Sequence, residues 1–305
     1  MGRMEMFTVY QLWNGVRKMW VMTRDESRGF TAHLVISELE SPLNRSREVY
    51  AMKEAAAAGT APTIFFVSLD GCAILMDYIS GGTLTMEHGK TPKITLKIAD
   101  LMRKVHALQK NPFYAPSFAT QMEEFYTQYS QKDSNQVIWE EAISIIKKSA
   151  LELQNLNAPV VNTHGDLNPR NILITNQDIY FIDWADGMYT DPFQDLAFFS
   201  IMIDYDSQEE KYFMQCYLKH VPTTAEIKRF RIAKRMNFAR LVLSSQGIGN
   251  QLSVEQNNKN YVPEILKEWS YYAKMFANDT ASLSAQFFWE QAQVALESAK
   301  AIDLT

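Results

Sequence analysis

Short runs of aromatic and β-branched residues dominate the first 80 positions and predict strands there. A helix is expected over residues 47–58, which are rich in good helix formers, and Gly59 is expected to end it. The predicted strands at 64–67 and 73–76 flank Asp70-Gly71, a strong hairpin signal. The predicted order is β-β-β-α-β-β, followed by a hinge at Gly81-Gly82. The predicted strands cover residues 7–10, 19–22, 30–36, 64–67 and 73–76.

Helical periodicity replaces the strand pattern in the rest of the chain. Apolar residues recur there every three or four positions, which places them on one face of a helix. Two pairs, Ser207 with Glu210 and Thr223 with Glu226, predict capping boxes that open two more helices. The periodic or helix-favouring stretches cover residues 94–108, 140–153, 265–276 and 282–302.

One hairpin-like segment interrupts the helical half. Residues 172–174 and 179–182 are apolar and flank a polar turn at 175–178. The sequence before it reads His-Gly-Asp-Leu-Asn-Pro-Arg-Asn over residues 164–171, and Asp183 follows it. Phosphoryl transfer needs a group that orients or deprotonates a hydroxyl, and oxygen ligands for Mg²⁺ on the nucleotide. We therefore expect Asp166 on the hydroxyl side, and Asn171 and Asp183 as metal ligands.

Composition narrows the class of protein. The chain has 305 residues, enough for one large domain or two lobes, and its hydrophobic and charged fractions are those of a globular protein. Its net charge of -5 argues against binding to duplex nucleic acid, which would need a basic surface. Two cysteines give no disulfide framework, and neither a signal peptide nor a membrane-spanning run is expected. These features predict a cytoplasmic protein without a membrane span.

The hairpin and its flanking motif resemble the active-site motif of the aminoglycoside phosphotransferase and choline kinase family. The stretch IDWADGMYTDPFQDLA, residues 182–197, is most similar to the bacterial choline kinase-like branch. The resemblance implies an α+β, protein-kinase-like fold of two lobes. A small β-rich N-terminal lobe with one helix would cover residues 1–80, and a larger, mainly helical lobe residues 81–305. It also implies that Asp166 is the catalytic base, that Asn171 and Asp183 bind Mg²⁺, and that Asp195 holds the catalytic loop.

The same resemblance assigns nucleotide contacts to the first lobe. Glu48 would be the helix glutamate that pairs with a basic residue on the third strand. His33 stands where the family has lysine or arginine, and a histidine carries only a partial positive charge near neutral pH. Met76 would stand behind the adenine of ATP, and backbone groups of two residues would hydrogen-bond to it. The full set of expected cofactor-binding residues is Gly15, His33, Glu48, Met76, Asp77 and Ile79.

The acceptor site is less sharply defined by the sequence. Family choline kinases carry an acidic residue and an aromatic residue shortly after the metal-binding aspartate, where this chain has Ala185 and Asp186. We expect Asp186 to face a cationic substrate, with Trp184 and Trp269 as aromatic neighbours. The aromatic residues near the C-terminus also suit a helical core, because they recur at helical spacing. Their alternative role is a cation–π box.

The sequence as a whole predicts an ATP- and Mg²⁺-dependent kinase that phosphorylates a hydroxyl of a small cationic metabolite, such as choline or ethanolamine. Its partners would be a nucleotide and a small-molecule acceptor. One alternative is an aminoglycoside, thiamine or amino-sugar kinase. Another is a nucleotide-binding pseudokinase with a regulatory role, suggested by His33. A protein kinase is disfavoured, since no activation segment resembling Ala-Pro-Glu follows Asp183.

Overall fold

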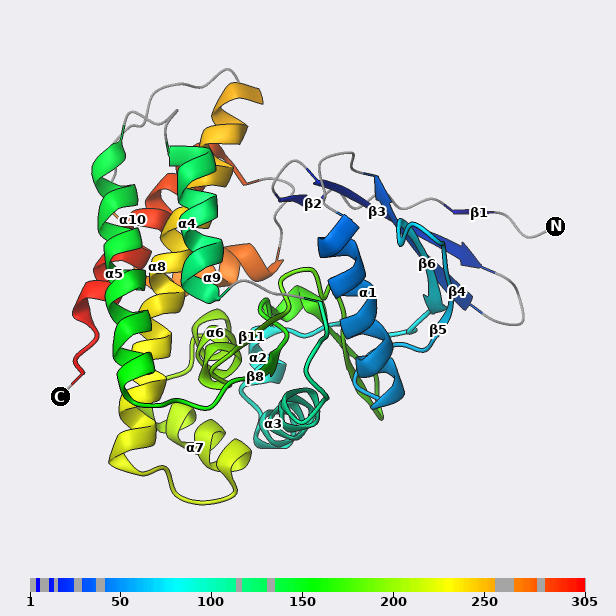
Figure 1. Cartoon of the computed structure of the whole chain (residues 1–305), viewed down its shortest axis with the longest axis horizontal. Helices are drawn as coiled ribbons and strands as arrows, with labels where there is room; N and C mark the ends of the chain where they lie inside the picture. Colours follow the sequence, from blue (N-terminus) through cyan, green and yellow to red (C-terminus); the bar gives the residue numbers. More distant parts are fainter. Residues whose placement is uncertain are drawn as a thin grey trace.

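A computed structural model describes this chain. It covers the backbone of residues 4–5, 11–13, 16–24, 29–36, 42–113, 117–130, 135–255, 266–278 and 283–304. Side chains are described within these stretches from residue 43 onward, apart from residues 255 and 278. The described chain is mixed helix and sheet: an N-terminal sheet with one helix lies beside a larger, mainly helical region (Figure 1).

The N-terminal strands form one antiparallel sheet in the order β1-β3-β4-β6-β5, with β2 paired to β3. The predicted strands at 19–22 and 30–36 lie within β3 and β4 and are confirmed, as is the hairpin around Asp70-Gly71. The expected strand at 7–10 lies outside the described residues. The strands are β1 (Met4–Glu5), β2 (Gln11–Trp13), β3 (Val16–Arg24), β4 (Gly29–Ile36), β5 (Ile64–Val67) and β6 (Ala73–Asp77).

Helix α1 (Pro42–Ala57) packs against this sheet and starts five residues before the predicted helix. The chain leaves it through Gly59, whose φ of 69° is a left-handed conformation that suits glycine. Met52 from α1 and Met76 from β6 belong to the same buried apolar cluster as Phe181 and Phe199 of the second lobe. The core therefore continues from the sheet into the helical lobe.

The segments around the β5–β6 hairpin are bonded to the hairpin of residues 172–182 in the second lobe, called the catalytic hairpin below because the predicted site residues flank it. Strand β7 (Gly82–Thr83) pairs with β9 (Ile172–Ile174), and the Phe181 amide donates to the Thr60 carbonyl at 2.8 Å. A Cβ atom on Gly81 would lie 2.2 Å from the carbonyl oxygen of Ile174. Glycine is thus required at position 81 by close backbone approach, in addition to the hinge role that the sequence predicted.

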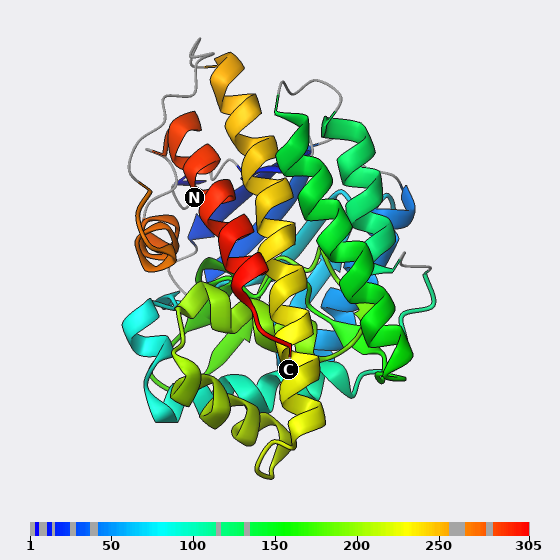
Figure 2. The same cartoon turned by 90° about the vertical axis from the view of Figure 1, so that its left-hand side faces the viewer.

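The larger lobe is built around the long helix α8, which packs against α5, α6 and α10 (Figure 2). Its core includes fully buried side chains from these helices, such as Trp139, Val242 and Ala295. None of the described helices combines the length and apolar character needed to cross a bilayer. The helices are α2 (Met86–Gly89), α3 (Pro92–His106), α4 (Phe118–Tyr129), α5 (Gln136–Asn155), α6 (Phe193–Ile203), α7 (Ser207–Leu218), α8 (Thr224–Glu255), α9 (Trp269–Asn278) and α10 (Ala285–Ala301).

One of the two predicted capping boxes is wrong by one residue. Asp206 caps α7, and the side chain of Glu209 returns to the Asp206 amide at 2.8 Å, whereas Ser207 and Glu210 were expected. Glu210 bonds instead to Ser200 and Lys234 on neighbouring helices. The second box is confirmed, since Thr223 and Glu226 exchange hydrogen bonds at the start of α8.

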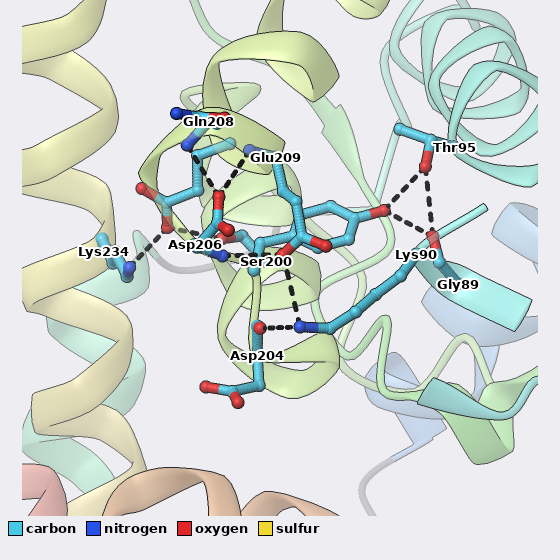
Figure 3. Close-up of polar contacts among 11 residues, drawn as sticks. Gly89, Lys90, Thr95, Ser200, Asp204, Asp206, Gln208, Glu209 and Lys234 are labelled. Atoms are coloured by element: carbon cyan, nitrogen blue, oxygen red, sulfur yellow. Dashed lines mark hydrogen bonds and ion pairs between the residues drawn. The ribbon is translucent and has the colours of Figure 1, made fainter. Parts of the chain in front are cut away.

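A polar network joins α2, α3, α6 and α7 (Figure 3). The hydroxyl of Tyr205 donates to the Gly89 carbonyl at 2.7 Å and lies 3.0 Å from the Thr95 hydroxyl. Lys90 contacts both the Asp204 carbonyl and the Glu209 carboxylate. Because Tyr205 and Thr95 are buried, these bonds replace water that the groups would otherwise bind.

Replacing Tyr205 with phenylalanine is expected to reduce the free energy of unfolding by about 1 kcal/mol, the usual net worth of one buried hydrogen bond. The effect is moderate because the Thr95 hydroxyl still donates to the Gly89 carbonyl at 3.1 Å. Urea unfolding would measure the change. The control is Tyr271→Phe, at a side chain that is 44% exposed, and the midpoint of that variant should stay at the wild-type value. An unchanged midpoint for Tyr205→Phe would contradict the expectation.

Candidate active site

The catalytic loop joins strand β8 (Val161–Thr163) to strand β9 and contains one turn of 3-10 helix, η2 (Pro169–Asn171). Asn168 caps this turn by accepting from the Arg170 amide at 3.0 Å, and proline occupies its first position, where a missing N–H costs nothing. Strand β10 (Ile179–Phe181) returns antiparallel to β9, as the sequence predicted.

The hairpin register brings the two expected metal ligands together. Beyond the last strand pair, the Ile182 amide donates to the Asn171 carbonyl at 3.0 Å. Asp183 therefore follows directly after a residue bonded to Asn171. Asp183 is buried and has a φ of 64°, an uncommon conformation for a residue with a side chain. Such local strain is typical of functional positions.

Asp166 is in contact with Asn171, one of the two expected metal ligands. The Asn171 side-chain amide donates to both the backbone carbonyl and the carboxylate of Asp166, each at 2.9 Å. The Asn168 amide donates to the same carboxylate oxygen at 3.0 Å. The structure thus brings Asp166 and Asn171 into direct contact and places Asp183 beside them.

Electrostatics within the group favour a bound cation. Burial raises the pKa of the Asp166 carboxyl, the Arg240 guanidinium opposes the rise, and the nearby Asp183 carboxylate adds to it. Two carboxylates this close repel each other when both are ionised, and a divalent cation would offset the repulsion. The Asn171 amide directs its NH₂ group at Asp166, which turns its oxygen to the opposite side.

The donor set suits Mg²⁺ better than a metal held by protein alone. In the described part of the chain, no group of three or more histidine, cysteine, aspartate and glutamate side chains is gathered to hold a metal. Mg²⁺ commonly takes one or two carboxylates, with the remaining ligands from phosphate and water. Asp183 and the oxygen of Asn171 fit that kind of site.

The buried carboxylate of Asp195, on α6, anchors the catalytic loop as the resemblance implied. It accepts the amides of His164 at 2.8 Å and Gly165 at 2.9 Å, and it also contacts the His106 ring at 3.0 Å. Burial acts to raise the pKa of Asp195, but its hydrogen bonds and the neighbouring histidine rings, with His106 foremost, outweigh burial and lower this pKa below its ordinary value. The His106 ring also contacts the Tyr217 hydroxyl at 2.8 Å, which links α3, α6 and α7 at this point.

His164 has a structural role in the loop. One ring nitrogen accepts the Asp166 amide at 3.3 Å, and the other lies 3.0 Å from the Ile182 carbonyl. Burial lowers the pKa of the ring, against the opposing charges of Asp195 and Asp183. The neutral ring, with Nδ1 as acceptor and Nε2–H as donor, therefore matches both partners and connects the loop to the strand that precedes Asp183.

Two arginines beside this site were not predicted. Arg240, on α8, donates to the Gly165 carbonyl and forms an ion pair with Asp186 at 2.9 Å. Arg170 stacks on the Phe276 ring of α9, 4.5 Å from its centroid. The only sequence signal for Arg240 was a lone charge within the apolar run of residues 238–243, which indicates a buried and paired side chain.

The structure describes only some of the expected nucleotide-binding residues. Gly15 and the side chain of His33 lie outside the described residues, so the pairing of His33 with Glu48 stays a prediction. Glu48 is buried on α1 at 2% exposure, which disfavours a solvated helix face. Met76 is buried as well. The Asp77 amide donates to the Thr63 carbonyl at 2.9 Å, and Ile79 follows β6 in the connection to β7. The contacts of Asp77 and Ile79 with adenine stay predictions.

The three expected acceptor residues have other partners in the structure. Trp184 is buried against the His164 ring, with 4.5 Å between centroids, and lines a cavity of about 430 Å³ between α1 and β11 (Met188–Thr190). Asp186 pairs with Arg240, and Trp269 donates to the Ile201 carbonyl at 2.9 Å. That cavity is not lined by Asp166. Contacts between these three residues and an acceptor remain predictions.

Comparisons with known proteins agree with this geometry. A family model described as choline/ethanolamine kinase matches residues 13–277. A probable ethanolamine kinase of Arabidopsis thaliana is 26% identical over 209 residues, which are 62% of this chain and 55% of that protein. The chain thus spans about half the length of this relative.

Solved structures share the fold at low sequence identity. A choline kinase from Streptococcus pneumoniae superposes with a TM-score of 0.65 and 19% identity, over 96% of this chain and 94% of that one. A spectinomycin phosphotransferase gives a TM-score of 0.55 and 16% identity, over 95% and 92%. The small sheet, the helical lobe and the catalytic hairpin define a protein-kinase-like fold. Within that fold, the chain belongs to the choline/ethanolamine kinase family.

Proposed function

We propose that this protein is an ATP-dependent kinase that transfers the γ-phosphoryl group to the hydroxyl of a small amino alcohol, with ethanolamine and choline as the first candidates. One observation carries the proposal: the Asn171 side chain contacts the Asp166 carboxylate, and the hairpin that follows Asn171 brings Asp183 beside them. Family membership supports the substrate class. The relative named as a probable ethanolamine kinase supports it further.

Asp166 would orient the acceptor hydroxyl and take its proton, a contribution that is typically about 10²–10⁴-fold. Asn171 and Asp183 would hold Mg²⁺, which neutralises charge on the phosphates when it is bound. The backbone amides of His164 and Gly165 are occupied by Asp195, so the loop is held in place before any substrate arrives.

The nucleotide would lie between a lobe of residues 1–80 and a lobe of residues 81–305. Its contacts would come from the first lobe and the connection after it, including Gly15, His33, Glu48, Met76, Asp77 and Ile79. The sequence has only two cysteines, Cys72 and Cys216, too few for a disulfide framework, and this supports the cytoplasmic location that we propose.

An acceptor panel tests the proposal. Purified protein would be supplied with ATP, Mg²⁺ and one acceptor at a time, and ADP release and product mass would be measured. We expect turnover of about 1–100 s⁻¹ on ethanolamine or choline, the usual range for kinases, and only background ATP hydrolysis with the others. The other acceptors are thiamine, glucosamine and an aminoglycoside.

Two outcomes would contradict the proposal. Turnover confined to the aminoglycoside, thiamine or glucosamine would move the chain to a different acceptor class. Magnesium-dependent ATP binding without turnover on any acceptor would instead indicate a regulatory pseudokinase. The second outcome would also give the histidine at position 33 a functional explanation, because the family has lysine or arginine there.

A further inference from the structure

A single buried arginine contacts both segments that carry the predicted catalytic carboxylates. Arg240 donates through Nη1 to the carbonyl of Gly165, the residue before Asp166. Through Nη2 it binds the Asp186 carboxylate at 2.9 Å, three residues after Asp183. Its guanidinium also lies 4.9 Å from the centroid of the Phe198 ring. The side chain of Arg240 is only 6% exposed, so its orientation is fixed by these contacts.

The two segments touch where Arg240 meets them. Gly165 has a φ of 84°, and a Cβ atom there would lie 2.0 Å from the carbonyl oxygen of Asp186. The Gly165 residue is held from both ends: its amide donates to Asp195 at 2.9 Å, and its carbonyl accepts from Arg240. No space is left for the segments to slide past each other without breaking one of these contacts.

We propose that Arg240 is a positioning residue for the phosphoryl transfer, and that its two contacts fix the segment carrying Asp166 relative to the segment carrying Asp183. This inference rests on the proposed function. Because a positive charge between the two segments also offsets the repulsion of the carboxylates, both geometry and charge require an arginine here. A misplacement of about 1 Å is enough to cost about 10²-fold in rate.

The same helix supplies a matched control. Arg229 forms an ion pair with the buried Asp191, with nitrogen–oxygen distances of 2.9 to 3.1 Å, and stacks 4.6 Å from the centroid of the Phe193 ring. Like Arg240, it combines a carboxylate partner with an aromatic ring, but its partners are neither Gly165 nor Asp186. Its loss should reduce stability without changing the positions of Asp166 and Asp183.

The experiment compares Arg240→Met, Arg240→Lys, Asp186→Asn and Arg229→Met with the wild-type protein. Circular dichroism and thermal unfolding establish that each variant is folded. Steady-state kinetics on the best acceptor give kcat and KM, and calorimetry gives the Kd of ADP with Mg²⁺. Arg240→Met should lower kcat by about 10- to 100-fold, because the segment carrying Asp166 loses its contact with Arg240. The Kd of ADP should stay within about threefold, because the hydrogen bond from the Ile182 amide to the Asn171 carbonyl still holds the segment carrying Asp183.

Arg240→Lys should be intermediate, because a lysine keeps the charge but lacks the fork that reaches both partners. Asp186→Asn should lower kcat less than Arg240→Met does, because the hydrogen bond from Arg240 to Gly165 survives. Arg229→Met should keep kcat within about threefold of wild type although its unfolding temperature falls, since the ion pair that is removed contacts neither Gly165 nor Asp186.

Other results would contradict the positioning role of Arg240. A kcat for Arg240→Met within about threefold of wild type, or an equal loss in Arg229→Met, would overturn the positioning role. Should Arg240→Met fail to fold, Arg240→Lys and Asp186→Asn decide in the same way. A wild-type protein that turns over no acceptor would overturn the proposed function itself, which is a different result from an active wild type whose Arg240 variants are equally active.

Discussion

Replacing Asp166 with asparagine is expected to lower kcat by about 10²–10⁴-fold while the protein stays folded, because the side chain loses its ability to accept a proton. Asparagine has the same shape, and its side-chain oxygen can still accept the amides of Asn168 and Asn171, which now share one carboxylate oxygen. The measurement is steady-state kinetics with the best acceptor. The Kd of ADP should change by no more than a few-fold, since the carboxylate of Asp166 is assigned to the acceptor.

The control for this prediction is Asp178→Asn. Asp178 lies in the exposed turn of the same hairpin, where its backbone carbonyl accepts the Thr175 amide at 2.9 Å, a bond that the substitution leaves in place. Its kcat should match that of the wild type. If Asp166→Asn retained wild-type activity on every acceptor that the wild type phosphorylates, the assignment of Asp166 as the base would be wrong.

Replacing Gly165 with alanine is expected to reduce the free energy of unfolding by at least about 3 kcal/mol and to abolish turnover. The positive φ alone costs an alanine about 1–2 kcal/mol. In addition, the new Cβ would stand 2.0 Å from the Asp186 carbonyl oxygen and 2.7 Å from its carbon. These are backbone atoms, so no side chain can rotate away, and the segments must separate. Denaturant unfolding and kcat both measure the result.

Substitutions at two other glycines separate the cost of the positive φ from the cost of the close contact with Asp186. Gly59 has a φ of 69°, and no atom lies within 4 Å of the position that a methyl group would take, so Gly59→Ala should show the conformational cost alone. Gly82 has open space and no left-handed φ, so Gly82→Ala should be close to wild type. If Gly165→Ala were as stable as Gly59→Ala, the close contact with Asp186 would contribute nothing.

Local signals in the sequence were enough to predict that Asp166 and Asn171 lie together beside Asp183, whereas the roles of the three residues stay predictions. Asp166, Asn171 and Asp183 fall within eighteen positions, and the intervening turn and strands have clear composition. Hydrogen bonds within that stretch, such as Asn171 to Asp166, are therefore set by the loop and hairpin themselves. The anchoring role of Asp195 came from resemblance to the family, and its bonds to the two loop amides confirm it.

Contacts between distant parts of the chain were not predictable in the same way. Arg240 is 75 positions from Gly165, and His106 is 89 positions from Asp195, so no spacing rule connects them. Both pairs depend on how the helices of the larger lobe pack.

The misplaced capping box has a similar cause. The sequence Asp206-Ser207-Gln208-Glu209-Glu210 offers two overlapping boxes of equal local quality. Glu210 is drawn into a tertiary ion pair with Lys234 and a hydrogen bond from Ser200, which leaves Glu209 to complete the box with Asp206. Tertiary structure thus chose between two local solutions.

The bonds that join the β5–β6 hairpin to the catalytic hairpin have a consequence for product release. Thr60 precedes β5 and is bonded to Phe181, while Gly81 follows β6 and packs directly on Ile174. If the two lobes open while both contacts are preserved, the N-terminal sheet must rotate about an axis through these two points. Under the proposed function, the hairpin would then stay still as ADP departs, and its predicted metal ligands would need no rebuilding before the next turnover.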